Sequence, residues 1–194
     1  HDDEPESIEE ISKEGYGGVL CIETGGPTPG LGCAGRGIIA ALEELEKKGA
    51  YEKYQPDVVI YDVLGDVVCG GFSMPMRKGY ADKVFIITSG ESMSVYAAAN
   101  IAMAVENFKS RGYASLGGFI LNKRNVKNEE EKAAELAADF HSSVIAEIDR
   151  SELVSEAEDI RKTVMEAFPD STAAEQYRAL ADKIAELCGM GEEK

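Results

Sequence analysis

The chain contains no G-x-x-x-x-G-K-[ST] sequence, the loop with which many nucleotide-binding proteins hold phosphate. No apolar run approaches the roughly 20 residues of a membrane-spanning helix, so we expect no membrane segment. Basic residues are also scarce, with 20 Lys and Arg against 36 Asp and Glu and a formal net charge of −16. Without a long basic patch, nucleic acid and acidic membrane surfaces are excluded as partners. We attribute the acidity mainly to solubility.

Cysteine is sparse as well. The chain has four cysteines in 194 residues, namely Cys21, Cys33, Cys69 and Cys188. This density is low for a fold built on disulfides, so we expect a reducing, cytoplasmic setting. In such a setting each cysteine is a buried apolar residue, a reactive thiol or a metal ligand.

What the chain does contain is an alternation of short apolar runs and helical patterns. The acidic residues 1–14 predict a short exposed helix, and a glycine turn follows them. Predicted strands are Val19 to Ile22, Val58 to Tyr61, Lys83 to Thr88, Leu116 to Leu121 and Ser143 to Ile148. Predicted helices are Ile38 to Lys48, Met93 to Arg111, Glu129 to Phe140 and Thr172 to Leu187, with a short helical piece within 149–160. This alternation predicts an α/β fold, a mostly parallel sheet with flanking helices.

Polar and sulfur-bearing residues follow several of these strands. They are Cys33, Asp62, Cys69, Ser89, Asn122 and Arg150. Parallel sheets of this kind bind ligands outside the carboxyl ends of their strands. We therefore expect the chemistry of the chain to lie at that edge.

Cys33 and Cys69 have matched surroundings, because each follows a turn and has glycine or alanine beside it. Bare backbone lets a bulky inorganic group approach and leaves N–H groups free to bond sulfide or thiolate. A four-iron cluster usually takes four thiolates, so two ligands per chain suggest a cluster shared across a two-fold axis. Cys21 lies within an apolar run and is expected in the core. Buried apolar cysteines, a disulfide and a zinc site remain open alternatives, although the CxxC spacing of structural zinc is missing.

Asp62 closes a predicted strand and is followed three residues later by Gly65. A carboxylate in this position can reach a water bound to Mg²⁺ or the γ-phosphate of a nucleotide, and the glycine can reorient when the phosphate leaves. Asp66 lies between Asp62 and Cys69, so this stretch could connect a nucleotide sensor to the sulfur. An Asp-x-x-Gly pattern alone is common by chance.

Longer motifs resemble those of a known family. Residues 21–37 and 61–75, which carry Cys33 and Cys69, resemble the two cluster-ligand regions of the nitrogenase iron protein family. Three further motifs match in the same order: Thr88-Ser-Gly-Glu-Ser-Met, Asn122-Lys-Arg-Asn and Tyr177-Arg-Ala-Leu-Ala. The resemblance runs from about residue 15 to residue 187.

The resemblance implies a P-loop NTPase-like fold and a homodimer in which Cys33 and Cys69 of both subunits hold one [4Fe-4S] cluster. It implies that MgATP hydrolysis drives single-electron transfer from a donor such as ferredoxin or flavodoxin to a larger catalytic partner. That partner would be a nitrogenase-type or a tetrapyrrole-reductase-type component. Asp62 would sense the γ-phosphate, and Asp66 would lie in the connecting segment.

The resemblance also implies contact residues. Asn122 would contact adenine, with Arg150 and Tyr177 near the nucleotide, while Arg36 and Phe72 would belong to the docking face beside the cluster. The chain departs from the family near the adenine pocket. Asp149 and Ser151 flank Arg150 where the family has Pro and Asp, and Ala173 stands where the family has Gln.

For domain organisation, we expect residues 1–14 to form an acidic N-terminal segment. Residues 15–194 would form an iron-protein-like α/β domain that lacks its first βα units, because the family's phosphate loop precedes the matching region. We therefore expect that residues 1–194 alone do not hydrolyse ATP. Two functions of other classes stay open: a partitioning-type ATPase switch without redox chemistry, and a structural dimer bridged through cysteine.

Overall fold

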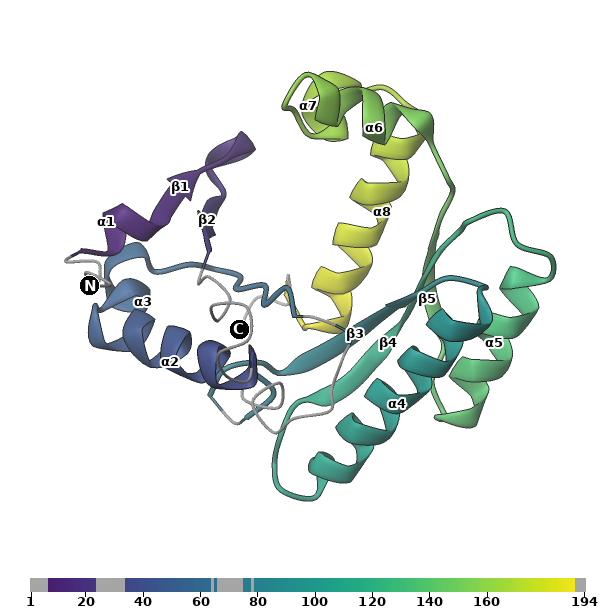
Figure 1. Cartoon of the computed structure of the whole chain (residues 1–194), viewed down its shortest axis with the longest axis horizontal. Helices are drawn as coiled ribbons and strands as arrows, with labels where there is room; N and C mark the ends of the chain where they lie inside the picture. Colours follow the sequence, from purple (N-terminus) through teal and green to yellow (C-terminus); the bar gives the residue numbers. More distant parts are fainter. Residues whose placement is uncertain (1–6, 24–33, 64, 66–74, 78, 191–194) are drawn as a thin grey trace. The chain divides into compact units, whose positions relative to one another are not determined.

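The computed structural model describes residues 7–23, 34–63, 65, 75–77 and 79–190 (Figure 1). The chain divides into two units, His1–Pro75 and Met76–Lys194, and each is described here by itself. The predicted cysteine ligands Cys33 and Cys69, together with Asp66 and Phe72, lie outside the described residues.

The first unit begins with helix α1 (Ile8–Ile11) and an antiparallel hairpin of β1 (Ser12–Glu14) and β2 (Leu20–Ile22). A 3₁₀ turn at Tyr16–Gly18 joins the two strands, and Gly17 adopts a left-handed φ of 70° there. The helix predicted across 1–14 is therefore much shorter than expected, and β1 was not predicted. The strand predicted for Val19 to Ile22 is present, shortened by one residue.

Cys21 is exposed rather than buried, so the prediction that it lies in the core is wrong. The physical reason is the hairpin itself. Cys21 pairs with Lys13 in a ribbon of two three-residue strands. Such a short ribbon is too small to bury both faces of a continuous apolar run.

Helices α2 (Ala34–Lys47) and α3 (Ala50–Tyr54) follow. Helix α2 starts four residues before the predicted Ile38 and buries Leu42 and Leu45 on one side, as its apolar spacing predicts. Gly49 separates the two helices with a φ of 65°, a backbone conformation that suits glycine. Helix α3 was not predicted.

The strand predicted for Val58 to Tyr61 is wrong, because the structure assigns no strand there. A strand exists through backbone hydrogen bonds to a neighbour, and no strand within the described residues pairs with this segment. Its apolar side chains are consequently exposed, with Ile60 at 83%.

The second unit is a parallel sheet of β3 (Lys83–Thr88), β4 (Ser115–Asn122) and β5 (Val144–Ile148), in that order. Helices α4 (Ser92–Lys109) and α5 (Glu129–Asp139) cover one face, and α8 (Thr172–Leu187) lies on the other side against β5 (Figure 1). All three strands were predicted to within one residue at each end. The predicted α/β class is thus confirmed.

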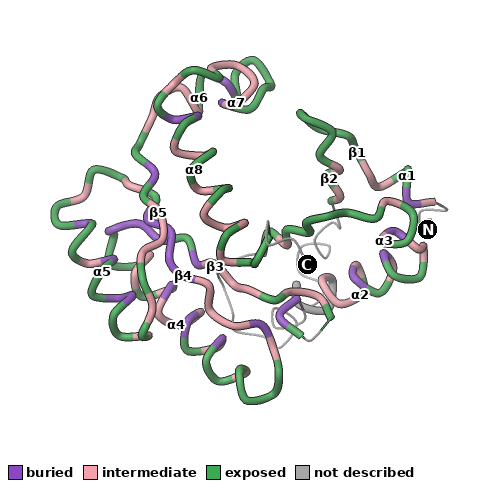
Figure 2. Tube along the Cα trace, turned by 180° about the vertical axis from the view of Figure 1, so that it is seen from behind, coloured by how far each residue is buried: buried purple, intermediate pink, exposed green. Residues whose placement is uncertain are grey.

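The main core lies between the sheet and its two covering helices (Figure 2). Phe119 of β4 is fully buried there and its ring lies 6.3 Å from that of Phe140. Small side chains on α4, Ala98 and Ala102, let this helix approach the sheet closely, as its composition predicts.

The chain closes with α6 (Glu152–Asp159), α7 (Val164–Ala167) and α8. They share a small core of Ala157, Val164 and Ala173. The predicted cap of α8 is confirmed, since Ser171 Oγ accepts a hydrogen bond from Ala174 N at 3.2 Å. Within the described part of the chain, no helix has both the length and the apolar character to cross a bilayer.

Candidate functional site

The carboxyl ends of β3, β4 and β5 bring several predicted residues to one edge of the second unit. Asn122 ends β4 and pairs in register with Ile148, which ends β5. Lys123 N donates a hydrogen bond to Ile148 O at 2.8 Å, which extends the pairing one residue past the strand. Asn122 and Arg150 therefore lie at the same edge, and both are exposed. Solvent-facing polar groups at this edge are available to a ligand.

Lys123 is the centre of a charged network at this edge. Its Nζ lies 2.7 Å from Glu147 Oε2, 3.1 Å from Glu130 Oε1 and 3.4 Å from Asp149 Oδ1. The side chain of Lys123 is only 19% exposed, whereas those of its three partners are 44 to 59% exposed. The largely buried side chain of Lys123 thus connects the end of β4 to β5 and to the start of α5.

Asp149 extends this network to α8. Gln176 Nε2 donates to Asp149 Oδ2 at 2.8 Å, and Asp149 N donates to Gln176 Oε1 at 3.1 Å. The reciprocal pair fixes the rotation of the Gln176 amide and anchors the helix to the end of β5. The next residue on α8 is Tyr177, which is half-buried and packs against the core of α6 and α7.

The network shifts the ionisation of its members in opposite directions. The pKa of Lys123 is raised above its ordinary value, first by the hydrogen bond to Glu147 and next by that to Glu130. The pKa of Asp149 is lowered, mainly by the hydrogen bond from Gln176 and then by that from Lys123. The pKa of Glu130 is lowered by its own backbone N–H and by Lys123. The charges of Lys123, Asp149 and Glu130 are therefore retained at neutral pH.

The loop after β3 is held against the start of α5. Glu129 is 5% exposed, and its Oε2 accepts hydrogen bonds from Arg124 N at 2.9 Å and Val126 N at 3.3 Å. A Cβ built on Gly90 would overlap Glu129 Cβ, so the two segments touch through bare backbone. Lys132 Nζ donates to Gly90 O at 2.9 Å. The loops after β3 and β4 are thus both joined to the start of α5 by direct contacts.

The remaining predicted residues belong to the first unit. Asp62 is exposed, and the residue before it is tied to α3 by a 3.1 Å contact between the hydroxyls of Tyr51 and Tyr61. The backbone of Arg36 lies in the first turn of α2. Cys33, Cys69, Asp66 and Phe72 lie outside the described residues, so their predicted roles stay predictions.

The donor chemistry of the predicted ligands fits an iron–sulfur cluster. Both Cys33 and Cys69 can supply a thiolate, and both have glycine on at least one side. The two described cysteines, Cys21 and Cys188, are free and exposed. Across the described ranges, no group of three or more His, Cys, Asp or Glu side chains is arranged to hold a metal ion.

Sequence reasoning did not identify Lys123, Gln176 or Glu129 as site residues. A weak signal existed for Lys123, since a cation directly after a strand-ending Asn faces the acidic end of the next strand. Glu129 also stands at the first position of a helix, where a carboxylate is favoured. Gln176 gave no signal, because its role depends on the docking of α8 against β5.

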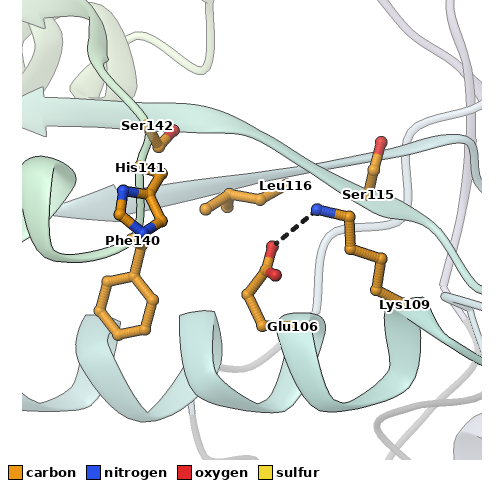
Figure 3. Close-up of a pocket in the computed structure, with 7 residues that line it drawn as sticks. All are labelled: Glu106, Lys109, Ser115, Leu116, Phe140, His141 and Ser142. Carbon is orange, nitrogen blue, oxygen red and sulfur yellow. Dashed lines mark ion pairs between the residues drawn. The ribbon is translucent and has the colours of Figure 1, made fainter.

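A small pocket of about 150 Å³ lies at the opposite ends of the strands (Figure 3). Ser115 begins β4 there, and His141 and Ser142 precede β5. Glu106 and Lys109, three residues apart on α4, both line it and point toward each other, 3.5 Å apart. None of the predicted site residues lines this pocket.

Two solved structures share this fold. MinD, the cell division ATPase of Pyrococcus furiosus, matches with a TM-score of 0.57 and 16% identity over 79% of this chain and 59% of its own. The MinD cell division protein of Aquifex aeolicus matches with a TM-score of 0.54 and 16% identity over 82% and 62%. At this identity the likeness concerns the fold alone, a P-loop NTPase-like α/β architecture.

Sequence relatives are much closer. The nitrogenase iron protein of Methanococcus voltae is 45% identical over 92% of this chain and 64% of its own length. Nitrogenase iron protein 2 of Methanothermobacter thermautotrophicus is 50% identical over 91% of this chain and 65% of its own length. The chain thus spans just under two thirds of the length of these relatives. A family model described as 4Fe-4S iron sulfur cluster binding proteins, NifH/frxC family, matches residues 1–189. The chain therefore belongs to the NifH/frxC family of 4Fe-4S iron–sulfur cluster binding proteins.

Proposed function

We propose that this protein is an ATP-dependent electron-transfer protein, a nitrogenase reductase or nitrogenase-like reductase component. It passes single electrons from a [4Fe-4S] cluster to a larger partner enzyme. The observation that carries the proposal is the family match over residues 1–189, within which both Cys33 and Cys69 fall. The names of the relatives, at 45% and 50% identity, support the same role.

Cys33 and Cys69 would supply two of the four cluster thiolates, and a second copy of the chain in a homodimer would supply the other two. When bound, the cluster provides a one-electron redox centre. Their glycine neighbours carry no side chain, so backbone N–H groups would be free to stabilise the negative charge of thiolate and sulfide. Arg and aromatic residues are enriched at protein interfaces, so Arg36 and Phe72 would meet the partner.

Nucleotide would bind at the edge that carries Asn122 and Arg150. The exposed amide of Asn122 has both a donor and an acceptor for the edge of adenine. Tyr177 lies one residue beyond Gln176, which is bonded to the residue before Arg150. Asp62 would bind a water of MgATP or sense the γ-phosphate, and Asp66 would relay its movement toward Cys69. The donor would be a ferredoxin or flavodoxin, the acceptor a nitrogenase-type or tetrapyrrole-reductase-type component, and the location cytoplasmic.

The test is to purify the full-length protein without oxygen and to measure iron, sulfide and visible absorbance. We expect about four irons and four sulfides per dimer. Cys33→Ala and Cys69→Ala should each abolish the cluster. Cys21→Ala and Cys188→Ala are matched controls, because both thiols are exposed and free, and they should retain it.

Iron near zero after anaerobic reconstitution would refute the proposal. Zinc without iron–sulfur absorbance would favour a structural dimer instead. Full ATPase activity and partner control in Cys33→Ala and Cys69→Ala would favour a switch without redox chemistry.

A further inference from the structure

Three residues of the charged network are chain neighbours of the three residues to which we assign nucleotide binding. Lys123 follows Asn122, Asp149 precedes Arg150, and Gln176 precedes Tyr177. The network members bond to one another, whereas the neighbours face solvent or the α6–α8 core. The backbone of each predicted contact residue is thus fixed by the residue beside it.

The ammonium of Lys123 has no donor left for a phosphate. A lysine Nζ carries three N–H groups, and three carboxylates from α5, β5 and the end of β5 surround this one within 3.4 Å. The network formed by Lys123 and its three carboxylate partners has one positive and three negative charges. Its net negative charge repels a triphosphate. Lys123 therefore fits a role at the base end of a nucleotide and not at the phosphate end.

We propose that Lys123 is a positioning residue for adenine recognition, acting through Asp149 and Gln176 on the placement of Asn122, Arg150 and Tyr177. The inference rests on the proposed nucleotide site. Lys123 would touch no part of the ligand. It would hold the end of β4, the end of β5 and α8 in one arrangement, so that Asn122 meets the base while Arg150 and Tyr177 lie near the nucleotide.

The bonds of Asp149 to Lys123 and Gln176 would compensate for the family's Pro and Asp, which are absent on either side of Arg150. Asp149 occupies the position before Arg150, and its carboxylate is bonded on one side to Lys123 and on the other to Gln176. Without Lys123, Asp149 would lose its cation and keep two carboxylate neighbours, Glu130 and Glu147. Repulsion among them would open the junction between β5 and α8.

The experiment measures how ATP, GTP and tripolyphosphate displace a fluorescent ATP analogue from the full-length, cluster-loaded protein. We expect Lys123→Met to weaken ATP about five- to tenfold, the size of two or three exposed ion pairs. Tripolyphosphate and GTP should change less than twofold, so the preference for ATP falls. Lys123→Arg should restore most of it, because a guanidinium also satisfies several carboxylates.

Two further variants separate positioning from general damage. Lys109→Met removes the same charge at the opposite end of the strands and should leave ATP binding unchanged. Gln176→Leu breaks only the link to α8. In the double variant Lys123→Met/Gln176→Leu, the loss of ATP affinity should be smaller than the sum of the two single losses, because both residues act through Asp149. Thermal midpoints are measured for every variant.

Equal weakening of all three competitors in Lys123→Met, or unchanged ATP preference in a folded variant, would overturn the inference while leaving the proposed function intact. Additive losses in the double variant would also overturn it. A wild-type protein that carries a cluster but binds no ATP would instead refute the nucleotide site itself, and the inference with it.

Discussion

Gly90→Ala is the substitution whose effect follows most directly from the structure. A Cβ at this position would overlap Glu129 Cβ and lie 2.7 Å from Glu129 Cα. Both obstructing atoms belong to or directly join the backbone, so no side-chain rotation relieves the contact. The loop after β3 or the first turn of α5 must move.

The magnitude comes from what moves with Glu129. Overpacking a filled site costs about 1–3 kcal/mol. The carboxylate of Glu129, 5% exposed, would also weaken its bonds to Arg124 N and Val126 N, and hydrogen bonds to a charged group contribute about 1.5–3 kcal/mol. We therefore expect Gly90→Ala to lower the free energy of unfolding by about 2.5–6 kcal/mol.

Urea denaturation followed by far-ultraviolet circular dichroism measures this change. Gly112→Ala is the matched control, because Gly112 has a φ of 75° but no atom near its missing Cβ. It should cost only the left-handed backbone penalty, about 1–2 kcal/mol. Removing the obstructing Cβ in Gly90→Ala/Glu129→Gly should make the double variant less destabilised than the sum of its singles. A cost for Gly90→Ala no larger than for Gly112→Ala, or an additive double variant, would refute the reasoning.

Three other outcomes are expected in the same assays. Phe119→Ala should cost about 3–5 kcal/mol, because the ring is fully buried between sheet and helices, and a loss under 1 kcal/mol would contradict that packing. Ser171→Ala should cost about 1 kcal/mol through loss of the α8 cap, whereas Ser171→Asp should retain most of it. Because the folded-state pKa values of Asp149 and Glu130 are lowered, their contribution is complete above the unfolded values of about 4 and is lost as pH falls through the folded values. The thermal midpoint should therefore fall in this acid range, and less steeply in Lys123→Met; equal slopes would contradict the network's role.

The second unit could be predicted from sequence because its signals are local. Lys83–Thr88 is an apolar run long enough for a strand covered on both faces, and its predicted bounds match the structure. Helix α8 likewise starts at a serine cap and has an apolar stripe, so both its bounds were predicted. Short elements such as α3 and α7 escaped prediction, since four or five residues carry too little periodicity.

The first unit shows why the same reasoning fails elsewhere. Val58 to Tyr61 has the composition of a buried strand, but composition does not supply a pairing partner, and the segment is exposed in the described chain. Cys21 sits in an equally apolar run, yet it faces solvent because its strand partner within the described residues is the short β1. Both errors concern which segments meet, a property that apolar character alone does not specify.

The candidate site divides in the same way. Asn122, Arg150 and Tyr177 were predicted as contact residues from the resemblance of their surroundings to a family pattern, and they stay predictions. Lys123 and Gln176 were missed because their partners lie on other elements, 26 residues away for Lys123 and Asp149 and 27 for Asp149 and Gln176. The chain neighbours of the predicted contact residues thus form a second layer whose bonds depend on strand pairing and helix docking, which the motifs themselves do not specify. Selection for one base can act on that layer, and substitutions there are expected to alter discrimination between nucleotides before they alter the fold.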